Sequence, residues 1–171
     1  MANLDLGLLT VASVKGGDIS LSMSRKGSQW LEGLDVFGTR ARNLKRPLDE
    51  WGRYIVEKIV PLQFERQGTP RRWARLSPDY AAWKRKHYGS LPILVLSGKM
   101  RAGFSWTATA RTLKVENKVK RRGGRPYWIY HQFGTSRMPQ RAILQMRAED
   151  REQLRRIILN WVLNRETAIG T

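Results

Sequence analysis

The chain has 171 residues, of which 41% are apolar, a net charge of +18 and no cysteine. The length and apolar content indicate a folded protein with its own core, and the lack of cysteine excludes disulfides, thiolate metal sites and a cysteine nucleophile. No apolar run is long enough to span a membrane, and residues 1–5 lack the features of a secretory signal, so we expect assembly in a reducing cytoplasm.

The positive charge is concentrated in the middle of the chain. Residues 71–137 hold sixteen Lys and Arg against two acidic residues, whereas each flanking region has a net charge of only +2. Such a block repels itself, and a nearby polyanion or acidic protein surface would relieve that repulsion. Two interpretations stay open, a solvated face that keeps the protein soluble and a surface that binds nucleic acid or an acidic partner; the charge density favours the second.

The first predicted elements are two strands in residues 6–24, joined by the turn sequence 15–18. Ile19, Leu21 and Met23 alternate with serines, which is typical of a strand with one wet face. Residues 27–38 are expected to be a connection with partly covered apolar side chains, namely Trp30, Leu31, Leu34 and Phe37.

The longest predicted helix follows. Apolar residues recur at steps of three and four and form one stripe: Leu44, Leu48, Trp51, Ile55, Ile59 and Leu62. Pro47 suits the first turn, and Pro61 is expected to kink or end the helix near Val60. Residues 68–70 are a clear break.

Ser77 marks the start of another helix, because its hydroxyl can accept a hydrogen bond from a free backbone N–H. Pro78 needs no partner there, and Asp79 suits the positive end of the helix dipole. Lys84–Lys86 would occupy the negative end before Gly89 closes the helix. A short helix is expected within residues 94–104.

The second half of the chain predicts a hairpin over residues 104–108 and 112–119, then a flexible basic loop over 118–125. The aromatic run 127–133 is expected to form a helical turn that ends at Gly134, and residues 141–146 a strand. The last helix would begin at Glu149 and bury one stripe, which consists of Leu154, Ile157, Ile158, Trp161 and Val162.

This order of elements predicts an α+β fold. A small, mostly antiparallel sheet would be packed by the long helix and the C-terminal helix, with an N-terminal β-hairpin or arm. We expect one domain over residues 1–171, in which 1–37 are the arm and its connection and 38–171 are the core.

Catalytic groups are sparse. His87 and His131 are the only imidazoles, no histidine spacing suits a metal, and the basic block holds only two carboxylates, far apart. His131 is more readily explained by packing than by catalysis. We therefore predict no enzymatic activity and no cofactor or metal, with a metal-dependent nuclease kept as a further hypothesis.

The basic segments that contain aromatic residues allow two interpretations. Their rings could stack on a nucleic acid strand, or Trp73, Trp83 and Tyr80 could be core residues with basic neighbours facing outward, and we prefer the second interpretation for the two Trp residues. The basic loop is the better candidate for contact with phosphates or an acidic partner; its cations are Lys118, Lys120, Arg121, Arg122 and Arg125. Further basic candidates are Arg71, Arg72, Lys84, Arg85 and Lys86. No motif for base-specific reading accompanies them.

Four segments in order resemble the phage virion morphogenesis family, the tail-completion proteins of Mu-like and P2-like phages. They include a Trp-x-x-Leu step, a Leu-x-x-Ser-Gly-x-Met step, a Tyr-His-Gln-Phe-Gly step and a Pro-x-Arg step. The matching residues are Trp73, Leu76, Leu96, Gly98, Met100, Tyr130, His131, Phe133, Gly134, Pro139 and Arg141. The resemblance covers about residues 44–161. Thr69 and Pro70 depart from the family's usual Pro-Asp/Glu-Gly, and the two N-terminal strands lie outside the shared region.

The resemblance implies a structural protein of the virion, a ring-forming tail terminator or tail completion subunit at the head–tail neck. Its partners would be itself, most readily as a hexamer, together with the tail tube and head–tail connector proteins, and genomic DNA in the channel is a further candidate. Assembly would take place in the host cytoplasm without a membrane. The alternatives are a sequence-independent DNA-binding protein and a head-side connector component, either a stopper or an adaptor.

Overall fold

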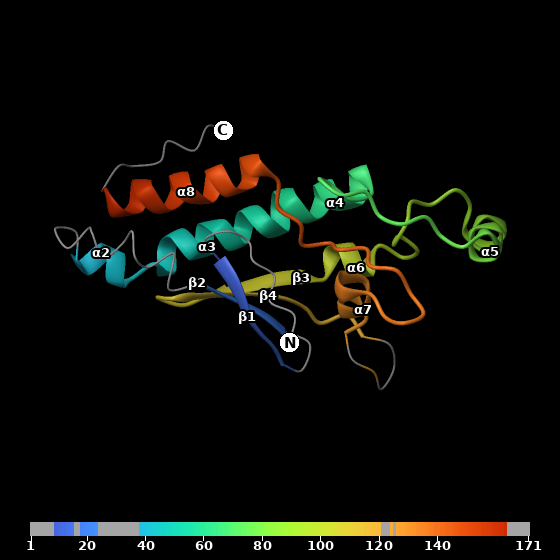
Figure 1. Cartoon of the computed structure of the whole chain (residues 1–171), viewed down its shortest axis with the longest axis horizontal. Helices are drawn as coiled ribbons and strands as arrows, with labels where there is room; N and C mark the ends of the chain where they lie inside the picture. The colour runs from blue at the N-terminus through green and yellow to red at the C-terminus, as the bar shows by residue number, and fades with distance from the viewer. Residues whose placement is uncertain (1–8, 16–17, 24–37, 121–123, 125, 164–171) are drawn as a thin grey trace. The chain divides into compact units, whose positions relative to one another are not determined.

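The computed structural model describes residues 9–15, 18–23, 38–120, 124 and 126–163. Its architecture is α+β, as predicted, with helices and a four-stranded sheet (Figure 1). The chain divides into two compact units. Unit 1 comprises Met1–Tyr54, Ser105–Glu116 and Ala148–Thr171, and unit 2 comprises Ile55–Phe104 and Asn117–Arg147. That the whole chain forms one domain stays a prediction.

The sheet lies almost entirely in unit 1 and has the strand order β1-β2-β4-β3. The predicted N-terminal hairpin is confirmed, because β1 (Leu9–Lys15) pairs antiparallel with β2 (Asp18–Met23). β2 in turn pairs antiparallel with β4 (Thr112–Asn117), and β3 (Phe104–Ala108) flanks β4 on its other side. Of the predicted connection over residues 27–38, residues 27–37 lie outside the described residues, and so do its four apolar side chains.

Two long helices of unit 1 pack on each other, α3 (Lys45–Tyr54) and α8 (Ala148–Val162), while the short α2 (Gly38–Arg42) packs on α8 (Figure 1). Their predicted apolar stripes are confirmed for most residues, since the helices bury Leu48, Trp51, Leu154 and Ile158 almost completely, whereas Leu62 is only half-buried. Trp161 is only half-buried. Its indole Nε1 donates to the carbonyl oxygens of Arg40 and Asn43, each at 3.1 Å.

Helix α3 approaches β3 closely at Gly52. A Cβ at that position would lie 2.3 Å from the Trp106 ring, so only glycine fits without movement. The Trp106 indole donates to Asp49 of the same helix at 2.9 Å. Across the helix pair, the Tyr54 hydroxyl donates to the buried Asp150 carboxylate at 3.0 Å. Unit 1 is therefore held together by close helix–helix and helix–strand packing, to which a few side-chain hydrogen bonds are added.

The α-helix α3 ends at Tyr54, which is also the last residue of the first segment of unit 1. A π-helical turn, η2 (Ile55–Ile59), follows, and then α4 (Val60–Arg66). Of the two predicted outcomes, an end of the helix near Val60 is wrong, because the chain stays helical to Arg66. A proline ring lacks an N–H and crowds the carbonyl four residues earlier, and the wider π turn just before Pro61 relieves that conflict.

The remaining helices of unit 2 are α5 (Pro78–Tyr88) and the shorter α6 (Lys99–Ala102) and α7 (Trp128–Phe133). Ser77 precedes α5 and Gly89 follows it, as predicted, but the Ser77 side chain makes no capping hydrogen bond. Aromatic pairs mark the core, with ring centroids 5.4 Å apart for Phe64 with Trp73 and 5.4 Å for Phe104 with Trp128.

The predicted strand over residues 141–146 is wrong, because the segment has no regular structure. Ile143 is completely buried and Met146 nearly so, which accounts for the apolar pattern. The backbone N–H groups of Ile143 and Leu144 bond to a side chain, Gln132, at 2.8 and 2.9 Å instead of to a neighbouring strand. A strand-like pattern therefore arises here without a sheet.

Candidate functional site

The four sequence motifs all lie in unit 2, and several of their residues are structural. Trp73, Met100 and Arg141 are buried, while Leu76, Gly98, His131, Phe133 and Gly134 are half-buried. Leu96, Tyr130 and Pro139 are exposed. The motifs thus combine internal anchors with a few residues at the surface.

Arg141 joins two distant segments. Its Nε donates to the carbonyl oxygen of Ala74 at 2.8 Å and its Nη2 to that of Arg75 at 2.9 Å. Its backbone N–H donates to the carbonyl oxygen of His131 at 2.7 Å. Burial lowers the pKa of Arg141, and the charge of Tyr80 opposes that change. The guanidinium is therefore an internal clamp on the chain that leads into α5.

The same two segments are tied by two further side chains. The Trp73 indole Nε1 donates to the carbonyl oxygen of Ala142 at 2.7 Å, and the Gln145 amide donates to that of Arg71 at 3.1 Å. Residues 71–75 belong to no helix or strand. Side-chain bonds to residues 141–145 therefore fix the position of a segment that secondary structure leaves free.

Two buried glutamines were not singled out from the sequence. Gln132 and Gln63 are each 1% exposed. The Gln63 side chain bonds both the N–H and the carbonyl oxygen of Thr69, at 2.9 and 2.6 Å, and closes the turn after α4. A signal existed for both, because each is a polar residue inside an otherwise apolar pattern, and such a residue needs an internal partner when buried.

His131 is half-buried in unit 2. Burial, with a smaller contribution from the Arg141 charge, lowers the pKa of His131 to about 4, so the ring is neutral near pH 7. Its Nδ1 is buried without a hydrogen-bond partner. The next corner requires glycine, because Gly134 has a φ of 74° and a Cβ there would lie 3.0 Å from the backbone nitrogen of Gln140. This arrangement supports the packing interpretation of the histidine.

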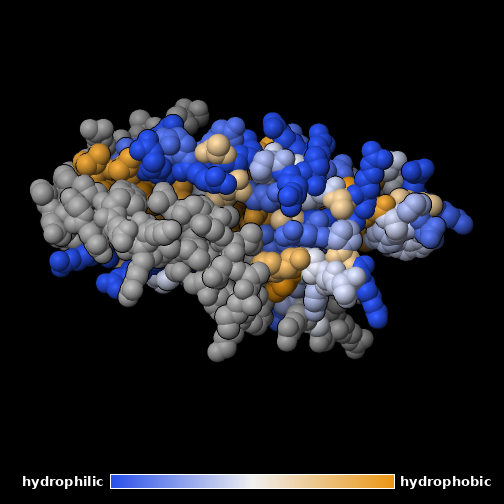
Figure 2. Space-filling view, viewed as in Figure 1, coloured by the Kyte–Doolittle hydropathy of each residue, from blue (hydrophilic) through white to orange (hydrophobic). Residues whose placement is uncertain are grey.

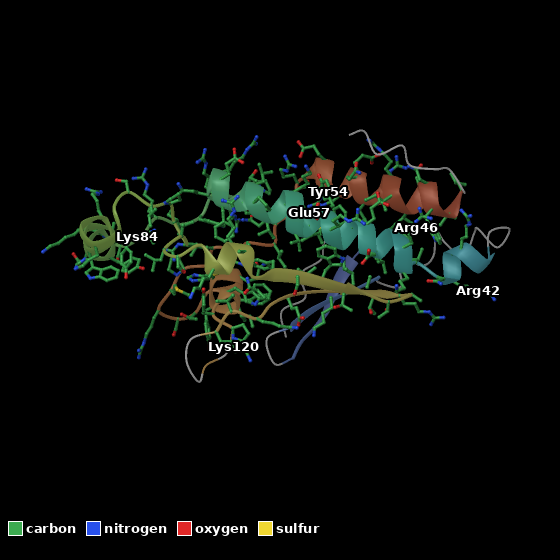
Figure 3. All side chains as sticks on the ribbon, turned by 180° about the vertical axis from the view of Figure 1, so that it is seen from behind. Arg42, Arg46, Tyr54, Glu57, Lys84 and Lys120 are labelled. Carbon is green, nitrogen blue, oxygen red and sulfur yellow. The ribbon has the colours of Figure 1, made fainter. Side chains whose placement is uncertain are left out.

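Most of the described basic candidates lie at the surface. Lys118, Lys120, Arg71, Arg72, Arg85 and Lys86 are exposed, whereas Arg121, Arg122 and Arg125 lie outside the described residues. Lys84 differs from the others (Figure 3), because it is 4% exposed and its Nζ donates to the carbonyl oxygen of Pro92 at 2.5 Å. Burial lowers its pKa. Lys84 is therefore a structural residue, not a surface cation.

Helix α5 carries aromatic side chains on its surface. Trp73 is a core residue as preferred from the sequence, but the same interpretation is wrong for Tyr80 and Trp83, which are 41% and 43% exposed. Trp83 lies at the centre of a group of rings, with centroid distances of 5.5 Å to Tyr80, 5.0 Å to His87 and 5.5 Å to Tyr88. We call these four residues the α5 aromatic cluster.

Within the described residues, no three acidic, histidine or cysteine side chains are grouped so as to hold a metal ion. None of the helices that the structure describes is both long and apolar enough to cross a membrane. Hydrophilic residues cover most of the described surface seen in Figure 2, with smaller apolar areas between them.

Comparison with known proteins identifies the family. A model described as the phage virion morphogenesis family matches residues 26–163. The chain belongs to this family. No curated protein and no solved structure matches it. The protein is therefore a component of phage virion assembly that works among other virion proteins, and its two N-terminal strands lie outside the matched region.

Proposed function

We propose that this protein is a ring-forming tail terminator, or tail completion subunit, at the head–tail neck of a tailed phage. The observation that carries the proposal is the unequal charge of the two units. Unit 2 has eighteen Lys and Arg against three acidic residues, a net charge of +15, whereas unit 1 has fourteen against eleven, a net charge of +3. Family membership supplies the virion setting.

Ring formation explains how so much positive charge can be tolerated. Many copies that close around the DNA path, or press on an acidic ring, would each face a compensating negative surface. Head-to-tail contacts between identical subunits give a closed ring when their rotation closes, and six copies would suit a tail terminator. Among the described strands β1 lies at the edge of the sheet, and its outer side would pair with a strand of the next subunit.

The proposal is tested by locating the protein in the particle. Native mass spectrometry of the purified protein should give a ring, with a hexamer expected, and electron microscopy of virions should place it between head and tail. A protein that stays monomeric and is missing from the virion contradicts the proposal. A ring on the head side of the joint would identify the connector alternative.

The basic loop is tested by charge reversal. Arg121→Glu with Arg122→Glu should leave folding intact but impair particle assembly or DNA retention. The matched control is Arg151→Glu with Arg156→Glu, which makes the same change of charge at exposed positions of α8 in unit 1. Equal particle yields from both double mutants and the wild type would show that the loop only adds solubility.

A second candidate function is sequence-independent DNA binding, which the exposed cations of unit 2 favour. Affinity for duplex DNA should then fall steeply with salt concentration, in proportion to the number of phosphates neutralised. A flat salt dependence removes this candidate. We expect no catalysis, and plasmid incubated with the protein and Mg²⁺ or Mn²⁺ should stay intact.

A further inference from the structure

Helix α5 and the chain after it expose an unusual amount of apolar surface. Six large apolar side chains are exposed among the described residues, and five of them lie between positions 80 and 96: Tyr80, Trp83, Tyr88, Leu91 and Leu96. The only residue that α5 buries is Lys84. A surface helix normally buries its apolar residues and exposes its charges, so α5 has the reverse pattern.

Hydrogen bonds and ring contacts fix the position of this surface. The Lys84 ammonium fixes α5 to the carbonyl oxygen of Pro92, and the Arg141 guanidinium fixes the residues that precede the helix. The His87 Nδ1 lies 2.8 Å from the carbonyl oxygen of Trp83 one turn earlier. The rings of the α5 aromatic cluster also limit one another's motion, because Trp83 stacks on Tyr80 and contacts the tilted ring of His87. A surface ordered in advance loses less conformational entropy when it binds.

The segment of the chain that carries the cluster is rich in positive charge. Residues 71–96 contain six Lys and Arg, of which five are exposed, and one acidic residue, Asp79. Tryptophan, tyrosine and arginine are the residue types that contribute most to protein–protein binding, typically as an apolar centre inside a polar rim. The described surface has this composition at α5.

We propose that the α5 aromatic cluster and the cations around it form the docking surface for a different virion protein, whose contacting face is apolar at its centre and acidic at its rim. The inference rests on the proposed function as a structural subunit of the virion. It adds the site at which that subunit binds its partner and the chemistry of the partner.

Other occupants fit the surface less well. Duplex DNA offers phosphates to cations but keeps its bases stacked, so four grouped rings would gain little from it. A symmetric contact between two copies would bring two basic rims together, which like charges oppose. An acidic protein surface satisfies both the rings and the cations.

Photo-crosslinking in assembled particles tests the proposal directly. p-Benzoylphenylalanine in place of Trp83 keeps an aromatic side chain at the position and reports its neighbour. We expect a crosslink to a different virion protein, within a peptide that contains apolar and acidic residues. A crosslink to a second copy of this chain, to DNA, or to nothing in the particle overturns the proposal.

Substitution provides a quantitative test. Trp83→Ala should lower incorporation into particles about tenfold, as expected for the loss of a central interface residue, while ring formation by the purified protein is unchanged. The control is Tyr130→Ala, which removes a ring of similar exposure, 42%, outside α5. Normal incorporation of the Trp83 variant overturns the inference alone. A wild-type protein that forms no ring and enters no particle refutes the proposed function instead.

Discussion

In unit 1 two helices bury apolar stripes against each other, whereas the helices of unit 2 are joined by long irregular segments. The backbone of those segments is bonded by buried side chains, above all Gln63, Gln132 and Arg141. The charge follows the same division, with +3 in unit 1 and +15 in unit 2.

The difference indicates how a strongly basic unit can remain ordered. Its internal positions hold neutral amides, a neutral histidine and cations that are already bonded to carbonyl oxygens, while the other described cations of unit 2, apart from the half-buried Arg147, are exposed. Because buried side chains fix these irregular segments, α5 stays in position although its aromatic side chains are exposed and not packed in a core. Unit 1 is dominated by apolar packing between helices, and unit 2 exposes cations and aromatic rings.

The largest expected effect is at the glutamine on which unit 2 depends. Gln132→Ala leaves the N–H groups of Ile143 and Leu144 without their partner, and the free energy of unfolding should fall by about 2–4 kcal/mol. Urea denaturation measures it. The control is Gln140→Ala, an exposed residue whose amide donates one bond to the Gln132 carbonyl oxygen, with an expected loss below about 1 kcal/mol. Equal losses would mean that unit 2 does not depend on this amide.

Unit 1 should respond instead to added volume. Gly52→Ala forces a methyl group toward the Trp106 ring and should lower the free energy of unfolding by about 1–3 kcal/mol. The neighbouring exposed position provides the control, since Arg53→Ala should change it by less than about 0.5 kcal/mol. If the Gly52 variant is as stable as the Arg53 variant, α3 does not pack as closely on β3 as described.

The pH dependence of stability should reveal His131 in unit 2. Its pKa in the folded protein is about 4, below the ordinary 6.5, so the unfolded chain binds more protons between these values. The contribution of the neutral His131 ring to the free energy of unfolding is therefore complete above about pH 6.5 and is lost as the pH falls toward 4. Because the ring is partly exposed, the loss should be roughly 1–2 kcal/mol. Denaturation across this range should show a shallower decline for His131→Gln, and an unchanged decline would contradict the assignment.

The smallest effect is expected at the start of α5. Ser77→Ala should cost less than about 0.5 kcal/mol, because the Ser77 side chain makes no capping bond, whereas a capping serine contributes about 1 kcal/mol. Thermal unfolding of this variant beside the wild type measures the difference. A loss near the larger value would mean that the cap predicted from the sequence does form.

Periodicity explains which parts of the fold the sequence predicted. The stripes of α3 and α8 and the β3–β4 hairpin follow regular repeats of apolar residues, and all were confirmed. The strand over 141–146 was wrong because the N–H groups of a buried apolar segment bond to Gln132, and a linear pattern does not reveal such a distant partner.

The candidate site was predicted less completely. The ordered motifs located Trp73 and Arg141 but did not distinguish internal anchors from surface residues. The spacing along α5 suggested that Trp83 is buried and Lys84 exposed, and the structure has the reverse. A lysine can enter a core when one carbonyl oxygen accepts its ammonium, and that contact with Pro92 depends on a turn that local sequence does not specify.

The N-terminal hairpin has a practical consequence for work with shortened forms of the protein. Residues 19–22 of β2 pair with residues 112–115 of β4, yet β2 lies before the region that defines the family. A fragment trimmed to residues 26–163 would present β4 as a bare edge, and bare edges recruit strands from other molecules. If such a fragment is insoluble, the reason would be that β2 no longer pairs with β4, and not that the matched region fails to fold.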